Sequence, residues 1–302
     1  MDHGDPGYLD LFRSGELRNK IDRAMEMLGS CTVCPRNCGV DRTIGETGFC
    51  RMGRKAVVAS YGPHFGEERP LVGRSGSGTI FFSGCNLACQ YCQNWDISQR
   101  ISGRETDPQD LAGIMMKVQG FGCHNINLVS PSHVVPQFLE ALDYACMKGL
   151  EIPIVYNTGG YDSLETLKIL DGIVDIYMPD MKYSDPSLGS ELSLVPEYPK
   201  VNRAAVKEMH RQVGDLVMDG DGVARRGLLV RHLVLPNGAA GTEEIVRFLA
   251  DEISPNTYVN IMDQYRPEYK AMEHPIVDRR LSSSEFGKAV RSAREAGLHR
   301  LD

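Results

Sequence analysis

The 302-residue sequence has little positive charge and no long hydrophobic run. Acidic residues outnumber basic ones, 40 to 33, and the basic residues form no stripe of the kind that follows a phosphate backbone. Nowhere do eighteen apolar residues stand together, and the first residues are not a basic stretch followed by an apolar one. We therefore expect a cytoplasmic protein that binds neither nucleic acid nor membrane.

The nine cysteines are not spread along the chain as a disulfide framework would be. Seven of them fall into two tight groups: Cys31, Cys34, Cys38 and Cys50, and then Cys85, Cys89 and Cys92. In a reducing cytoplasm, clustered thiols favour metal ligation. Cys123 and Cys146 stand alone, and we expect them to be packing residues.

From residue 79 onward, short β-branched or aliphatic runs alternate with helical patterns. The sequence predicts six strands, at 79–83, 125–130, 152–157, 173–178, 228–235 and 258–262. It predicts helices at 17–28, 108–119, 134–148, 163–170, 202–213, 242–251 and 284–296. This alternation indicates a parallel sheet, because parallel neighbours need a helical crossover. The predicted fold class is α/β, a partial (β/α)6 TIM-like barrel whose chemistry gathers at the carboxyl ends of the strands.

Residues 31–53 contain too few apolar side chains to build a core of their own. We therefore expect two parts: an N-terminal helix with a four-cysteine metal-binding segment (1–74), and the partial barrel with its C-terminal helix (75–302). A structural metal would replace hydrophobic burial in the first part. The spacing permits zinc, a rubredoxin-like iron or an auxiliary iron–sulfur cluster. A structural role, tying the segment over the barrel, and a role in electron transfer or substrate binding both remain open.

The second cysteine group has the spacing Cys-x3-Cys-x2-Cys and follows the first predicted strand. A [4Fe-4S] cluster has four irons and is usually held by four cysteines, so three would leave one iron available for another ligand. Zinc or three incidental thiols are the alternatives, but zinc prefers four ligands and Cys-x2-Cys pairs. The spacing and the strand that precedes it favour the cluster.

This motif resembles that of the radical S-adenosylmethionine (SAM) superfamily. The resemblance implies that the open iron binds SAM, which is cleaved reductively to a 5′-deoxyadenosyl radical that takes hydrogen from a substrate. It also implies that Tyr91 lies near the adenine. Most of the chain, from the Cys34–Cys38 segment to the strand at 258–262 and the residues after it, resembles the branch related to the pyruvate formate-lyase activating enzyme.

The later strand ends carry this second resemblance. Where activases have a Gly-Gly-Glu-like turn for the SAM amino group, this sequence has Ser130-Pro131-Ser132-His133, so Ser130 and Ser132 would take that role. The resemblance further implies that Lys182 pairs with the SAM carboxylate. The remaining cofactor-binding residues that it implies are Asn157, Thr158, Asp180 and Arg231.

Each strand-end residue also has a structural explanation. Asp180 and Lys182 are two apart on one strand and would form an ordinary ion pair, while Asn157 would cap a loop. Four polar strand ends beside a cysteine loop together favour the cofactor site.

The resemblance predicts hydrogen abstraction that activates a glycyl-radical enzyme, with a flavodoxin or ferredoxin as electron donor. The departures at 130–133 and 157 favour almost equally the radical modification of a peptide side chain or small metabolite. A third hypothesis is a non-catalytic iron–sulfur electron-transfer module, which would have no use for polar strand ends.

Overall fold

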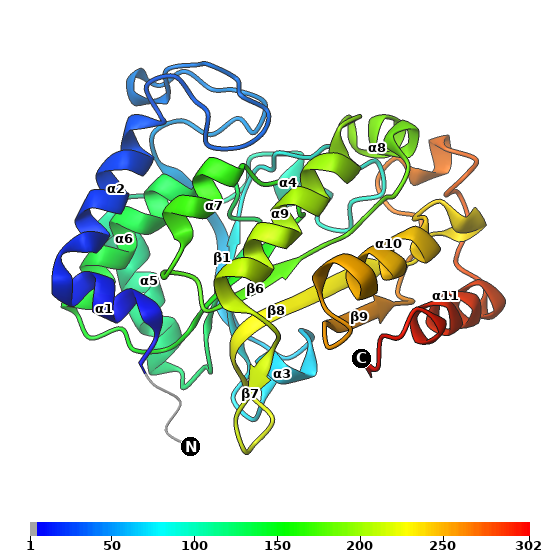
Figure 1. Ribbon diagram of the computed structural model, residues 1–302. Coiled ribbons are helices and arrows are strands. Elements are labelled where there is room, and N and C mark those ends of the chain that lie inside the picture. The colour runs from blue at the N-terminus through cyan, green and yellow to red at the C-terminus, as the bar shows by residue number, and fades with distance from the viewer. Residues whose placement is uncertain (1–4) are drawn as a thin grey trace.

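The computed structural model describes residues 5–302, which form one central sheet with helices packed around it (Figure 1). The strands follow the order β10-β9-β8-β6-β5-β4-β2-β1-β3, and β7 pairs with β8 as a side hairpin. Their bounds are β1 (Ala56–His64), β2 (Ser77–Phe82), β3 (Arg104–Thr106), β4 (Ile126–Val129), β5 (Ile154–Thr158), β6 (Ile176–Pro179), β7 (Val217–Met218), β8 (Ala224–Leu233), β9 (Tyr258–Met262) and β10 (Arg300–Leu301).

All six predicted strands form, as β2, β4, β5, β6, β8 and β9, and they are parallel in that order. The two edges of the sheet, β3 and β10, do not pair with each other. The predicted α/β class, with an open, partial TIM-like barrel and a Cys-rich N-terminal segment, is therefore confirmed. The short β10 adds a further parallel strand beside β9.

Two antiparallel strands extend the sheet beyond the predicted barrel. β1 pairs with β2, and β3 pairs with β1 on the outside. β1 contains Gly62 and Pro63, a pair that is typical of a turn and does not predict a strand. Because β1 lies before residue 75 and bonds to β2, its ladder crosses the expected division between residues 74 and 75.

The helices follow the predicted pattern, and shorter ones fill the connections. Their bounds are α1 (Gly7–Ser14), α2 (Glu16–Glu26), α3 (Arg69–Val72), α4 (Trp95–Ser98), α5 (Pro108–Gly120), α6 (Val135–Met147), α7 (Leu164–Leu170), α8 (Pro186–Ser193), α9 (Tyr198–Val213), α10 (Thr242–Phe248) and α11 (Ser283–Glu295). Short 3-10 turns occur at η1 (Arg42–Ile44), η2 (Pro236–Gly238) and η4 (Ala271–Glu273), and η3 (Leu249–Ile253) is a π-helical turn.

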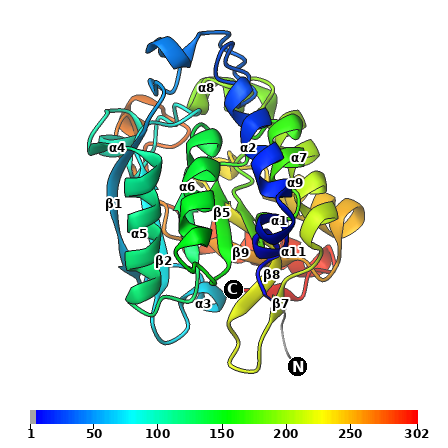
Figure 2. The ribbon, with the colours of Figure 1, turned by 90° about the vertical axis from the view of Figure 1, so that its left-hand side faces the viewer.

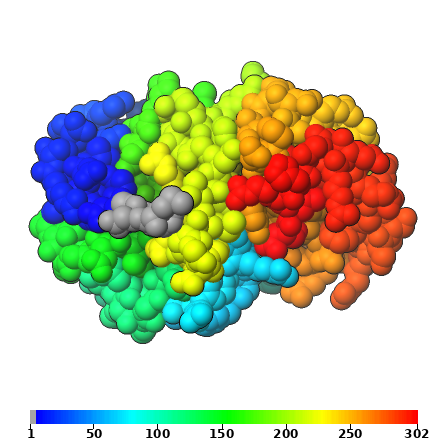
Figure 3. Space-filling model, turned by 60° about the horizontal axis from the view of Figure 1, so that its bottom comes forward, coloured from blue at the N-terminus to red at the C-terminus, as the bar shows by residue number. Residues whose placement is uncertain are grey.

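The predicted helices cover one face of the sheet, and α2 forms an additional layer outside α6 and α7 (Figure 2). α9 starts four residues earlier than predicted, with Pro199 in its first turn, where proline suits a helix. α10 ends at Phe248, because the chain widens there into η3. The N-terminal helices and α11 lie at opposite ends of the molecule (Figure 3). Within residues 5–302, no helix has both the length and the apolar character that crossing a membrane requires.

Alternate residues of the central strands point to opposite faces, and both faces are buried. Tyr156 and Tyr177 belong to the main core beneath the helices. Val155, Met178 and Leu229 point into the barrel, where they pack with Leu71 of α3. These apolar side chains fill the barrel at the amino ends of its strands. The inward-facing residues at the carboxyl ends of the strands are not part of this apolar packing and line the candidate site described below.

Candidate active site

A cavity of about 580 Å³ lies at the carboxyl ends of the parallel strands. Asn157, Asp180, Arg231 and Asn260 line it, and each stands two residues beyond an inward-facing apolar residue of its own strand or strand end. Because side chains alternate along a strand, the same face that is apolar at the bottom of the barrel is polar at its mouth. The volume falls in the range of small-molecule sites.

Four polar side chains in this cavity form one network across three neighbouring strands. Lys182 Nζ lies 2.6 Å from Asp180 Oδ2, and Arg231 Nε lies 2.9 Å from Asp180 Oδ1. Arg231 Nη2 also donates to Asn157 Oδ1 at 2.7 Å. The ion pair expected between Asp180 and Lys182 is present, and Arg231 joins it to β5.

The charges of these side chains determine whether Asp180 and Lys182 are ionised. Burial alone would raise the pKa of Asp180, but Arg231 and Lys182 together lower it below its usual value. Burial opposes the charged form of Lys182, yet the Asp180 carboxylate raises the lysine pKa. The carboxylate and both cations are therefore charged at neutral pH.

The helix α9 holds the backbone of the same strand ends. Tyr198 donates its hydroxyl to the carbonyls of Gly159 and Asp180, at 2.8 and 3.0 Å. Asn202 Nδ2 donates to the carbonyls of Gly160 and Asp180. These bonds fix the loops on which the charged side chains stand.

Ser130 lines the cavity with a left-handed backbone, at φ 57°. Ser132 does not line it: its hydroxyl lies 2.9 Å from that of Thr158, which donates in turn to Asp162. Thr158 borders the cavity, but its hydroxyl is committed to this buried group. Of the two serines expected at this turn, Ser130 is therefore the one exposed to the cavity.

The three cysteines of the loop after β2 line the same cavity. Ser193 Oγ lies 3.0 Å from Cys89 Sγ, and Ser98 Oγ lies 3.1 Å from Cys92 Sγ. Burial raises the pKa of Cys89, and the positive charge of Lys182 opposes that rise. The loop therefore presents three thiols beside a cation.

Three thiols that line one cavity form a donor set that suits a [4Fe-4S] cluster with one open iron. The same cavity continues to Lys182 and Asp180. Zinc, the alternative for this loop, prefers four ligands, and the loop supplies three cysteines.

Tyr91, between the last two cysteines, is buried and lines the cavity. Its hydroxyl accepts a hydrogen bond from the Tyr183 hydroxyl at 2.7 Å, and its ring meets that of Tyr265 edge-on. The tyrosine is therefore a fixed wall of the cavity.

Sequence reasoning missed the polar wall of the site that faces the charged network. Glu67 and Glu68 enter the cavity from the loop after β1, and Asn260 Nδ2 donates to Glu68 Oε1 at 3.1 Å. Burial raises the pKa of Glu67. The adjacent acidic pair before α3 is the one sequence signal of this wall, and only the β1–β2 hairpin brings it to the site.

A family model described as the radical SAM superfamily matches residues 79–215. The matched range contains the three-cysteine loop, Asn157, Asp180 and Lys182. Residues 79–215 are thus similar to the radical SAM domain, and that superfamily implies an enzyme with a [4Fe-4S] cluster and SAM.

Two curated relatives come from Methanocaldococcus jannaschii. The uncharacterized protein MJ0674 is 33% identical over 306 residues, which cover 99% of this chain and 84% of that protein, so the two chains belong to one family. The uncharacterized protein MJ0808 is 24% identical over 269 residues, covering 81% of this chain and 73% of that protein.

Among solved structures, the chain is similar to Streptococcus suis SuiB, crystallised with the precursor peptide SuiA. The TM-score is 0.47 at 14% sequence identity, and the match covers 70% of this chain but 43% of that one.

His232 joins the site strands and gives a test of their packing. Its Nδ1–H donates to the Met181 carbonyl at 2.7 Å, and its Nε2 accepts from the Thr242 hydroxyl at 2.8 Å. Burial lowers the pKa of His232 to about 4. The unfolded chain, with an ordinary histidine pKa, therefore binds one more proton between these two pKa values.

We expect this histidine to destabilise the fold by about 2 kcal/mol as the pH falls from about 7 to about 5. In the His232→Asn variant, urea unfolding at both pH values should show a shallower pH dependence than in wild type. His299→Asn, at an exposed position, is the control and should keep the wild-type slope. Equal slopes in all three proteins would contradict the assignment.

Proposed function

We propose that this chain cleaves SAM reductively in the cavity at the carboxyl ends of its strands and directs the resulting radical at a substrate hydrogen. The observation that carries the proposal is one cavity lined both by Cys85, Cys89 and Cys92 and by the Asp180, Lys182, Arg231 and Asn157 network. An electron-transfer module would not need such a network.

Cys85, Cys89 and Cys92 would hold the [4Fe-4S] cluster. When reduced by one electron, such a cluster supplies the electron that breaks the S–C5′ bond of bound SAM, and the 5′-deoxyadenosyl radical then abstracts hydrogen. The protein's own contribution is to fix the cofactor and exclude water. A flavodoxin or ferredoxin is the donor we propose.

Lys182 is placed to bind the SAM carboxylate. Its ammonium pairs with Asp180 at 2.6 Å, and its charge acts on the Cys89 thiol of the same cavity, so it would attract the carboxylate of SAM beside the cluster that the three cysteines would hold. Ser130 would accept from the SAM ammonium, with Asp180 and Arg231 fixing the surrounding charge. Tyr91, packed against Tyr183 and Tyr265, would border the adenine.

Two substrate classes fit the cavity. In the first, the loop of a partner glycyl-radical enzyme enters through the open side of the barrel, since the sheet does not close. In the second, a peptide side chain or a small metabolite enters. The polar wall of Glu67, Glu68 and Asn260 faces whichever substrate binds.

Removing one thiol of the loop tests the cluster. After anaerobic reconstitution with iron and sulfide, wild type with dithionite and SAM should form 5′-deoxyadenosine, and Cys85→Ala should reduce the product to background. Cys146→Ala, at a buried cysteine on α6, is the matched control and should retain activity. Product formation by Cys85→Ala at the wild-type rate would contradict the assignment.

The Lys182→Gln variant tests the carboxylate partner. Loss of a charge-assisted hydrogen bond of about 1.5–3 kcal/mol should raise the KM for SAM by roughly 10- to 150-fold. Lys200→Gln, at an exposed position on α9, should leave that KM unchanged. Circular dichroism checks that both variants fold. An unchanged KM in Lys182→Gln would exclude the lysine as a SAM ligand.

The two substrate classes predict different products. Reduced enzyme, SAM and a glycyl-radical protein encoded by the same organism should give the doublet of a glycyl radical in electron paramagnetic resonance. Absence of the doublet with every such protein, while 5′-deoxyadenosine still forms, would favour a peptide or metabolite. Iron binding without any SAM cleavage would support the electron-transfer module instead.

A further inference from the structure

A second, enclosed cavity lies inside the Cys-rich segment. Cys31, Cys34, Cys38 and Cys50 all line it, although 18 residues lie between the first and the last. The segment has almost no regular structure to hold these side chains together: η1 is its one helical turn in the described chain. Four thiols nevertheless meet around one space.

Two guanidinium groups line the same cavity and lack a carboxylate partner within residues 5–302. Arg42 is 1% exposed and donates from Nε to the Gly53 carbonyl and from Nη1 to the His133 carbonyl. Arg36 donates from Nε to the Asn86 carbonyl and from Nη1 to the Leu194 carbonyl. The remaining nitrogen of each, Nη2, is buried without a hydrogen-bond partner.

A buried cation with no opposite charge is strongly unfavourable, and a buried N–H without an acceptor adds to the cost. The Arg36 and Arg42 side chains therefore point to an anion in this cavity. His133 lines it as well, and its Nδ1 is a third buried nitrogen without a partner. Thiolates bound to a metal centre would supply the missing charge and sulfur acceptors.

We propose that Cys31, Cys34, Cys38 and Cys50 hold a second iron–sulfur cluster. Zinc or a single iron bound by these four thiolates would bring no acceptor besides the cysteine sulfurs, whereas an iron–sulfur cluster adds inorganic sulfides. Those sulfides would accept hydrogen bonds from the unpartnered Nη2 groups of Arg36 and Arg42. With four cysteines, no corner remains for SAM.

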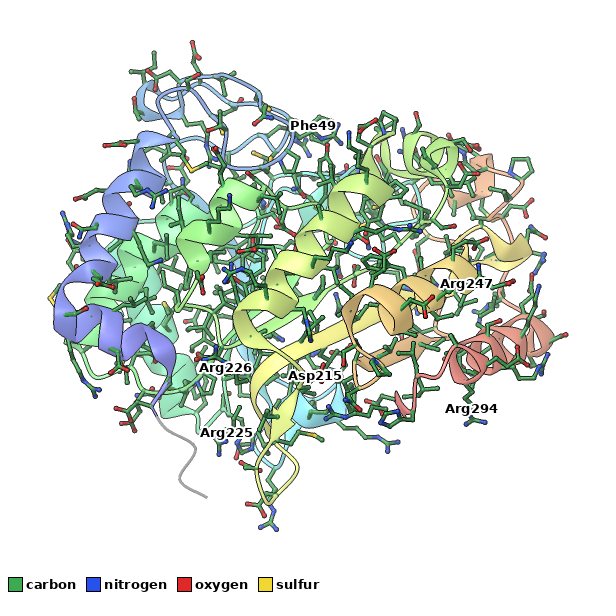
Figure 4. All side chains as sticks on the ribbon, in the orientation of Figure 1. Phe49, Asp215, Arg225, Arg226, Arg247 and Arg294 are labelled. Carbon is green, nitrogen blue, oxygen red and sulfur yellow. The ribbon has the colours of Figure 1, made fainter. Side chains whose placement is uncertain are left out.

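The second site lies directly against the loop of the first. Besides the Arg36 bond to Asn86, His133 Nε2 contacts the Ser83 carbonyl at 2.9 Å. The Cys50 carbonyl lies so close to Gly84 that a Cβ there would come within 2.5 Å of it. Phe49, under the Arg36 guanidinium at 3.6 Å, lies on the side of the segment that faces α8 (Figure 4). The cluster would thus anchor the segment against the 83–92 loop.

Metal and sulfide analysis of the full chain tests the proposal independently of SAM cleavage. The triple variant Cys85→Ala, Cys89→Ala, Cys92→Ala, purified anaerobically and reconstituted, should retain about two to four irons per chain with equal acid-labile sulfide. Zinc in place of iron, a single iron without sulfide, or no metal would overturn the proposal. None of these results depends on whether the first site cleaves SAM.

The reverse variant, Cys34→Ser, should lose that iron and sulfide, and Cys123→Ser should lose none. Because Cys34→Ser risks unfolding, Arg36→Gln provides a variant with all four thiols intact. Removing the positive charge disfavours addition of an electron, so a redox titration of Arg36→Gln should show a lower midpoint potential for one of two clusters. Wild-type protein with one cluster and one zinc would contradict the proposal.

Discussion

A buried carboxylate between two cations determines how the open end of this barrel is built. Asp180 directly follows β6, Arg231 belongs to the neighbouring β8, and Lys182 comes two residues after Asp180. Loss of Asp180 would leave two cations in a largely buried place without the carboxylate that they share. The strand ends are therefore tied by charge where their backbone pairing stops. From α9, Tyr198 and Asn202 bind the Asp180 carbonyl and leave this carboxylate little freedom.

The parallel strands could be predicted because they are buried on both faces. A strand that packs helices on one side and the barrel interior on the other is a continuous apolar run, and such runs are visible in sequence. The antiparallel strands β1 and β3 carry no such signal: β1 is exposed over much of its second half and contains Gly62 and Pro63. Its position depends on pairing with β2, which is a tertiary contact.

The same reasoning explains which site residues could be predicted. The spacing of Cys85, Cys89 and Cys92 can be recognised within a short stretch of sequence. Once the strands are known, the alternation of side chains along them predicts that Asn157, Asp180 and Arg231 point into the barrel. Thr158 is next to Asn157, so its hydroxyl turns to Asp162 and Ser132, on the outer side of the strand. Glu67 and Glu68 reach the cavity from before the first barrel strand, through a hairpin that periodicity does not show.

Each cysteine group has positively charged side chains beside it, but the two groups differ in what those side chains bind. A cluster bound by thiolates is anionic, and positive charge or N–H donors beside its sulfurs stabilise it when it is buried. In the first site, Lys182 and Arg231 form ion pairs with Asp180, so positive and negative side chains would both surround the charged cofactor. In the second site, Arg36 and Arg42 form no ion pair with a carboxylate of residues 5–302. Both arginines line the cavity of the four thiols, and the Nη2 atom of each has no hydrogen-bond partner. In the proposed enzyme, the first site would exchange a ligand at its open iron. The second site, with four cysteines and with hydrogen bonds to the 83–92 loop, would have a purely structural or electron-transfer role.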